Sequence, residues 1–214
     1  MPIIPSAHVR IANVAGDLVL LDLERDDYLA LSVRDAEALF AALNGCEHDP
    51  TDPILLELLQ GGFVEESPTP SELTRSLPSL PLPDPIPPGV ASKIWMLLLF
   101  GQAVPMTLMS YCRSLGGLTE QAPAPASQDK YSPQRISGIV QWFERLRICV
   151  PRSGRCLIQS LLLLHFLRLL GIRPELVLGV RTHPFEAHCW VEWNSLVLND
   201  NVDHVSWYTV IARF

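Results

Sequence analysis

The sequence predicts an α+β protein with two folded domains on either side of a proline-rich linker. Eight prolines lie within residues 67–89, a stretch with almost no helical or strand periodicity. Strand-like runs and then helical patterns precede this stretch, whereas helical patterns and then strand-like runs follow it. We therefore expect a small domain over residues 1–67, a semi-rigid linker over 68–92 that holds the domains at some distance, and a larger domain over 93–214.

The first domain is predicted to contain a hairpin followed by two helices. Residues 18–22 and 28–31 are strand-like and flank a polar turn, and residues 8–12 can add a strand. Ser32 is a suitable N-cap for the first helix, and Pro53 suits the first turn of the second. The apolar face of the second helix comprises Ile54, Leu55, Leu58 and Leu59.

The second domain is predicted to begin with three helices. Residues 91–111 have a helical pattern that we expect to break near Pro105, and residues 136–149 have a second amphipathic pattern. The third helix begins at Cys156, and its leucine-rich pattern ends at Gly171, a typical residue for a helix C-terminus.

The end of the chain predicts an antiparallel sheet that packs on these helices. Residues 176–180, 187–193 and 196–199 are rich in Val, Leu and Trp. Asn194 and Ser195 provide a tight turn between the last two runs.

Composition and charge exclude several classes of protein. The net charge of -7 and the pI near 5.3 argue against nucleic-acid binding, which relies on clustered Lys and Arg. The apolar run 94–100 is too short to span a bilayer and is interpreted as core. The N-terminal residues do not resemble a secretory signal, and the five scattered cysteines do not form a paired framework. We expect a cytoplasmic protein with reduced thiols and no membrane partner.

Cys156 is the first candidate for chemistry, because it begins a helix. The partial positive charge of a helix N-terminus favours the thiolate form, which is the nucleophilic form. The alternative is a cysteine that packs as a small apolar residue.

His188 and Asp200 complete a candidate catalytic triad. His188 starts a predicted strand, and Asp200 follows it by twelve positions, within reach of the adjacent hairpin strand. A thiol, a base and an acid that orients the base are what nucleophilic catalysis requires.

Other histidines and cysteines offer alternatives. His165 lies in the leucine-rich helix and is interpreted as structural, while His183 and His204 are weaker candidates for the base. Cys189 points to the strand face opposite His188, which favours a core role. The Cys and His spacings match no paired zinc-ligand motif, so we expect no metal site, and no glycine-rich phosphate motif indicates a bound nucleotide.

The segments CLIQSLLLLHFLRLLGIRPELVLGV and PFEAHCWVEWNSLVLND resemble the leader peptidases of lasso-peptide biosynthesis, which are transglutaminase-like cysteine proteases. The resemblance covers residues 136–200 and implies that Cys156 is the nucleophile, His188 the base and Asp200 the acid. Cys189 departs from the alanine that related sequences often carry.

The segment DLVLLDLERDDYLALS, followed by a helix and GGFVEE, resembles the PqqD-type recognition domain, a small winged helix-turn-helix that captures the leader of a precursor peptide. The resemblance implies that the leader adds as a strand to a sheet edge and packs on the last helix. The corresponding residues are Tyr28, Leu29, Ala30, Leu31, Leu55 and Leu58.

Together these resemblances imply a cysteine endopeptidase that removes the leader from a lasso precursor. They also imply a separate asparagine-synthetase-like cyclase as partner and an ATP-dependent pathway, although no ATP motif is present. Two alternatives stay open: acyl transfer through a thioester on the same cysteine, and a non-catalytic adaptor that delivers the precursor to the cyclase.

Overall fold

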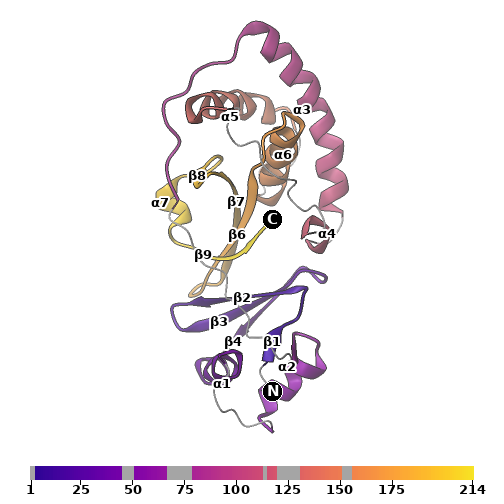
Figure 1. Ribbon diagram of the computed structural model, residues 1–214, viewed down its shortest axis with the longest axis vertical. Helices are drawn as coiled ribbons and strands as arrows, with labels where there is room; N and C mark the ends of the chain where they lie inside the picture. Colours follow the sequence, from indigo (N-terminus) through magenta and orange to yellow (C-terminus); the bar gives the residue numbers. More distant parts are fainter. Residues whose placement is uncertain (1–2, 45–50, 67–78, 113–114, 120–130, 151–155) are drawn as a thin grey trace.

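The computed structural model describes residues 3–44, 51–66, 79–112, 115–119, 131–150 and 156–214. Helices and sheets are mixed, as the sequence predicts. Figure 1 shows a smaller N-terminal body, with the helices α1 and α2 on one side of a sheet, and a larger C-terminal body on the other side of that sheet.

Three antiparallel strands form the N-terminal sheet: β2 (Val9–Val14), β3 (Asp17–Asp22) and β4 (Asp27–Leu31), in the order β2-β3-β4. Ala15 and Gly16 join β2 to β3 with φ values of 52° and 103°, as a two-residue hairpin turn requires. A separate pair, β1 (Ile3–Pro5) and β5 (Val64–Glu66), closes the domain. Among the described residues β4 pairs with β3 alone, so its other edge is free of any described strand and can accept a further one.

Two helices cover one face of this sheet, as predicted. Ser32 caps α1 (Val33–Leu43), and Asp52 caps α2 (Pro53–Gln60) by accepting a hydrogen bond from the Ile54 amide. The apolar residues of both helices pack with those of the sheet and of β1 and β5 in one core. The winged helix-turn-helix relationship stays a prediction.

β3 is buried on both of its faces. Leu18 and Leu20 belong to the core under α1 and α2, whereas Val19 and Leu21 belong to the core of the C-terminal body. Every residue from Leu18 to Leu23 is at most 2% exposed. Burial on both faces explains why this strand is a continuous apolar run and does not alternate with polar residues.

The described end of the linker is docked on the second domain. Leu80 forms a parallel bridge with Leu196, and the Ile86 amide donates to the Gln134 carbonyl at 2.9 Å. A Cβ atom on Gly138 would lie 1.9 Å from the Ile86 carbonyl oxygen, so only glycine permits this close approach. The expectation that the linker holds the domains apart is wrong, because this segment is docked and one core contains residues of both domains.

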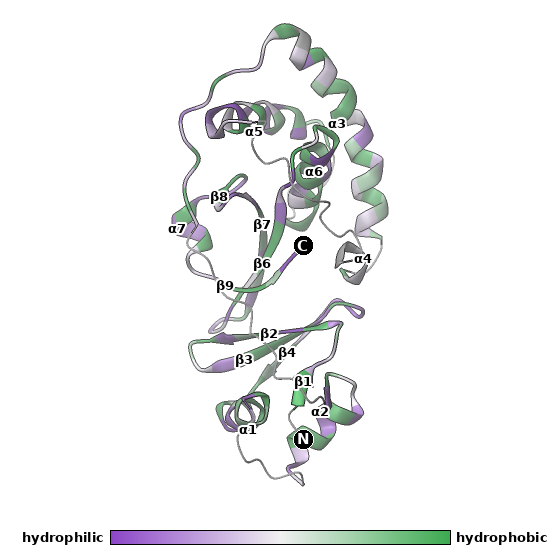
Figure 2. Ribbon diagram, viewed as in Figure 1, coloured by the Kyte–Doolittle hydropathy of each residue, from purple (hydrophilic) through white to green (hydrophobic). Residues whose placement is uncertain are grey.

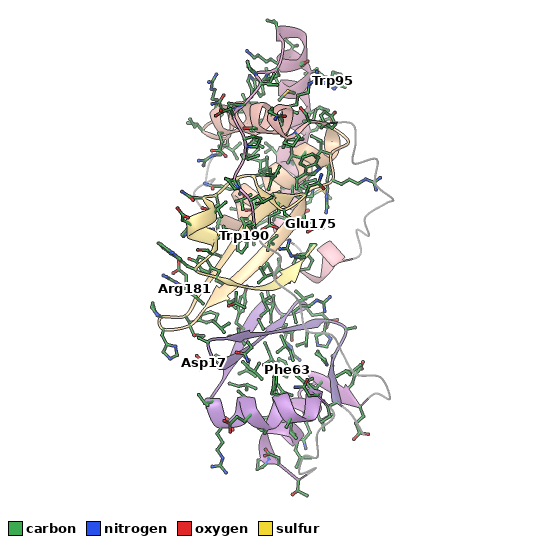
Figure 3. The ribbon with its side chains drawn as sticks, turned by 60° about the vertical axis from the view of Figure 1, so that its left-hand side comes forward. Asp17, Phe63, Trp95, Glu175, Arg181 and Trp190 are labelled. Carbon is green, nitrogen blue, oxygen red and sulfur yellow. The ribbon has the colours of Figure 1, made fainter. Side chains whose placement is uncertain are left out.

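The first helix of the second domain, α3 (Val90–Tyr111), continues through Pro105, where we expected a break. Pro105 cannot bond to the Gly101 carbonyl, but both residues are exposed, so water can replace that bond. The run 94–100 is core only in part, since Trp95 is 60% exposed and points outward in Figure 3. Figure 2 shows hydrophobic residues along much of α3. By length and composition alone, α3 could cross a membrane, but core helices of soluble proteins meet the same criterion.

The rest of the second domain packs helices on a four-stranded antiparallel sheet in the order β8-β7-β6-β9. The core helix α6 (Cys156–Leu169) lies against the sheet, beside α3 and α5 (Pro133–Arg147). The sheet comprises β6 (Glu175–Arg181), β7 (Glu186–Trp193), β8 (Leu196–Val197) and β9 (Thr209–Arg213). The short helices are α4 (Gly116–Thr119) and α7 (Val202–Val205).

Candidate active site

Cys156 is the first residue of α6, as predicted, and is half-buried. The helix is anchored because Leu161, Leu163, Leu164 and Phe166 are at most 1% exposed. This anchoring fixes the direction of the helix N-terminus, whose partial positive charge stabilises an anion at Cys156.

The structure brings Cys156, His188 and Asp200 together. α6 packs against β7, which carries His188, and the Cys156 thiol hydrogen-bonds with the His188 ring. His188 Nε2 lies 2.5 Å from Asp200 Oδ2. Because Nε2 is bound to Asp200, Nδ1 is the ring nitrogen left for the thiol. The order thiol, imidazole, carboxylate is the one that a catalytic triad requires.

Hydrogen bonding lowers the pKa of Cys156 and raises that of His188. Hydrogen bonds from Cys189 and His188 lower the pKa of Cys156 to about 4, against the opposing effect of burial. The pKa of His188 is raised by its hydrogen bond to Cys156 and by Asp200, again against burial. Both pKa shifts favour a thiolate facing an imidazolium, which is the activated form of a cysteine nucleophile.

Cys189 has a second role that strand alternation did not predict. Its side chain is 3% exposed and belongs to the core, as expected, but its thiol also hydrogen-bonds to Cys156. The reason is that α6 packs on the face of β7 that carries Cys189, so the sulfur at the helix start reaches both Cys189 and His188. The negative Cys156 sulfur and burial in turn raise the pKa of Cys189.

A second histidine holds the other oxygen of Asp200. His204 Nδ1 lies 2.9 Å from Asp200 Oδ1, and its ring centroid is 4.9 Å from that of His188. His204 is thus a partner of the acid, and of these two histidines it is His188 that bonds the thiol. His188, Asp200 and His204 also offer three metal-ligand atoms within 4.8 Å of one another, but the hydrogen bonds between the same groups account for this cluster.

Aromatic rings surround His188. The Trp190 ring stacks near it with a centroid separation of 6.0 Å, and the Tyr208 ring lies at 5.1 Å. Gly179 pairs with His188 across the sheet, and a Cβ there would lie 2.8 Å from both Trp190 and Tyr208. Glycine at this position therefore permits the packing that fixes the His188 ring.

A polar bridge beneath the triad joins the three segments that carry it. The buried Ser160 hydroxyl donates to the Cys189 carbonyl at 3.1 Å and accepts from the Asn199 amide at 3.0 Å. Asn199 also accepts from the Val191 amide at 2.8 Å. Ser160 lies one helical turn after Cys156, while Cys189 and Asn199 adjoin His188 and Asp200 in sequence. The role of Ser160 could have been found from its spacing, because residues four apart, such as Cys156 and Ser160, lie on the same face of a helix.

Two other histidines lie outside the site. His165 is 2% exposed and its Nε2 is 2.9 Å from the Ser110 hydroxyl, which confirms the structural interpretation. His183 lies in the turn between β6 and β7, where Nδ1 is 3.4 Å from Asp17 Oδ2. Figure 3 shows Asp17 and Arg181, two residues before His183, on facing sides of the boundary between the domains.

The predicted peptide-binding residues divide into two groups. Tyr28, Leu29 and Ala30 lie on the edge strand β4 and are each partly or largely exposed. Leu31, Leu55 and Leu58 are 6%, 1% and 1% exposed and belong to the core of the first domain. Direct contact of a peptide with this second group is therefore excluded in the observed conformation.

The sequence matches the transglutaminase-like superfamily over residues 102–213, which include all three triad residues. No curated protein and no solved structure matches the chain. Transglutaminase-like domains are usually cysteine-dependent enzymes, with activities of the cysteine-protease or acyltransferase type. With a matched region that covers just over half of its length and a cysteine paired to a histidine and an aspartate, the chain belongs to the transglutaminase-like superfamily.

Proposed function

We propose that this protein is a cysteine endopeptidase that removes the leader from a ribosomally made lasso precursor. The observation that carries the proposal is the placement of Cys156 at the start of α6, beside a His188 ring whose Nε2 lies 2.5 Å from Asp200 Oδ2. The resemblance of CLIQSLLLLHFLRLLG and PFEAHCWVE to lasso leader peptidases supplies the substrate class.

In the proposed reaction, the Cys156 sulfur attacks the carbonyl carbon at the junction of leader and core. The Cys156 backbone N–H, at the helix N-terminus, would donate to the oxyanion that forms. His188 then gives its proton to the leaving amine, and the leader stays on Cys156 as a thioester. His188 next takes a proton from water as the water oxygen attacks the thioester carbonyl; the C–S bond then breaks, which releases the leader as a carboxylic acid and restores the Cys156 thiolate beside a protonated His188.

The open edge of β4 is the proposed site for the leader. Strand addition uses main-chain hydrogen bonds for affinity and alternate side chains for specificity. Tyr28, Leu29 and Ala30 are accessible at this edge, while Leu31, Leu55 and Leu58 support it from the core. A leader strand beside β4 would become the fourth strand of the sheet β2-β3-β4.

The wider pathway is part of the same proposal. The core amine freed by cleavage would be joined to an acidic side chain by a separate asparagine-synthetase-like cyclase, which would consume the ATP that the pathway needs. A cytoplasmic location suits a peptidase that acts on a newly made precursor.

Incubation of the purified protein with a lasso precursor, followed by peptide mass measurement, tests the reaction class. A single hydrolytic cut supports the peptidase, a condensed product supports acyl transfer, and an unchanged precursor that stays bound supports an adaptor. Cys156→Ala should abolish cleavage, whereas Cys149→Ala, at an exposed thiol outside the triad, should leave it unchanged. Cleavage by Cys156→Ala at the wild-type rate would exclude the proposed nucleophile.

The leader site needs a point variant, because deleting the first domain would also remove β3 from the core of the second. Leu29→Asp places a charge on the 38% exposed edge residue without touching the triad. Fluorescence anisotropy of a labelled leader peptide should show weaker binding to this variant. Unchanged affinity would place the leader elsewhere.

A further inference from the structure

We propose that Tyr28, from the first domain, lies beside the substrate-binding face at Cys156 and contacts the precursor next to the bond that is cut. Both domains would then build the substrate site, and Tyr28 would be a specificity-determining residue. This inference rests on the proposed peptidase function. It goes beyond leader capture at the β4 edge, because it gives the Tyr28 side chain a contact with the residues around the cut.

The position of the Tyr28 ring carries the inference. Tyr28 is partly buried against the core of the second domain, which Cys156 and Ala187 also border. Its ring meets that of Phe185 edge-to-face, with centroids 5.5 Å apart. Phe185 is 48% exposed and precedes His188 by three residues, so Tyr28 approaches the site from the side of the base.

Strand alternation explains why only part of β4 faces the second domain. Leu29 and Leu31 point toward α1 and α2, because Leu31 lies in the core of the first domain. Tyr28 points to the opposite face, which the sheet presents to the second domain together with Val19 and Leu21 of β3. A peptide strand along β4 would therefore meet Leu29 on one side and Tyr28 on the side of Cys156.

Hydrogen bonds between the domains hold this end of β4 in place. The Leu115 amide donates to Asp26 Oδ1 at 2.7 Å, two residues before Tyr28. The Gly116 amide donates to the Leu23 carbonyl at 2.8 Å. The turn that leads into β4 is thus fixed to the second domain, and Tyr28 is fixed with it.

The surroundings of Tyr28 keep its hydroxyl protonated. Burial, with smaller contributions from Cys189 and Cys156, raises the pKa of Tyr28 to about 12. The phenol is therefore a hydrogen-bond donor at every pH at which the enzyme would work. We expect the ring to pack on a substrate side chain next to the cut, and the hydroxyl to donate to a main-chain carbonyl of the peptide.

Two substrates and three variants separate contact beside the cut from leader binding. The substrates are the full precursor and a short peptide that spans the cut without the leader. Tyr28→Ala should lower kcat/KM on both by about 10-fold or more, as expected when a packed contact is lost in the transition state. Leu29→Ala, the matched control on the other face of β4, should affect the full precursor alone. Tyr28→Phe should recover the part of the loss that is due to the ring.

Labelling of Cys156 gives a readout that does not depend on turnover. A peptidyl chloromethyl ketone with the residues that precede the cut should label Tyr28→Ala more slowly than wild type, whereas iodoacetamide should label both equally. Equal rates with the peptidyl reagent, or cleavage of the short peptide at the wild-type rate, would overturn the inference. If wild type cut neither substrate, the peptidase function would fail, and the labelling rates would still decide the place of Tyr28.

Discussion

Replacing Cys189 by alanine tests how the structure activates Cys156. The change removes the thiol that hydrogen-bonds to the Cys156 sulfur but keeps a small apolar side chain at a position that is 3% exposed. His188, Asp200 and the Ser160 bridge to the Cys189 backbone carbonyl are unaffected by it. Because alanine keeps a small apolar side chain at this buried position, the variant should fold and stay active.

The expected shift follows from the strength of the lost bond. A hydrogen bond to a charged group contributes about 1.5–3 kcal/mol, which corresponds to about 1–2 pKa units at about 1.36 kcal/mol for each unit. Cys156 is only half-buried, so solvent screening favours the lower end of about 1 unit. The pKa of Cys156 should rise from about 4 toward about 5, which leaves the thiolate dominant at neutral pH.

The pH dependence of iodoacetamide alkylation measures this pKa directly. Peptide mass analysis assigns the modification to Cys156 and separates it from Cys46, Cys112 and Cys149. Cys149→Ala is the control, since that thiol is exposed and should not alter the curve. An identical apparent pKa in wild type and Cys189→Ala would refute the role of the Cys189 thiol as a donor, and would leave His188 and the helix N-terminus as the causes of activation.

Three further changes test other contacts. Asp200→Asn removes the negative charge beside His188, so the pKa of His188 should fall. The basic limb of the kcat–pH profile should then move to lower pH, and kcat should drop by about 10²–10⁴-fold. An unmoved basic limb would argue against the ion pair between His188 and Asp200. Ser160→Ala leaves the Cys189 carbonyl and the Asn199 amide without their buried partner, so the free energy of unfolding in urea should fall by about 1–3 kcal/mol. If stability were unchanged, water would have to replace the hydroxyl. Gly138→Ala places a Cβ 1.9 Å from the Ile86 carbonyl oxygen and should cost about 1–3 kcal/mol. Gly101→Ala is the control, because Gly101 lies at an exposed position of α3 and a Cβ there has no neighbouring atom within 4 Å; this change should stabilise the protein by about 0.5–1 kcal/mol. Equal effects of the two changes on stability would show that the linker is not docked.

Local signals predicted the parts of the molecule that depend on neighbours in sequence. Ser32 and Asp52 cap their helices because a side-chain oxygen needs only the next few amides. The start of α6 at Cys156 and the strand that carries His188 were likewise visible from periodicity. Asp200 could be paired with His188 because a hairpin returns the chain to the same edge.

Contacts between distant segments were not predictable in the same way. Alternation along β7 predicted that Cys189 lies in the core, but not that its thiol hydrogen-bonds to Cys156. That hydrogen bond depends on where α6 crosses the sheet. β9 was missed because it is short and pairs with β6, far away in sequence. The proline-rich composition predicted an extended linker, and the described residues 79–89 contain no helix, but composition could not reveal that Leu80 bonds to the second domain.

The continuous apolar run of β3 indicates burial on both faces of the strand, but the fold was needed to identify the second core. A hairpin with one solvated face needs polar residues at alternate positions, and β3 has none between Leu18 and Leu21. Because one strand belongs to two cores, the two domains cannot move apart without exposing Val19 and Leu21 to water. The edge of β4 therefore stays at a fixed place relative to Cys156. Under the proposed function, the spacing between leader and cut is set by this shared strand, and the length of the linker has no part in it.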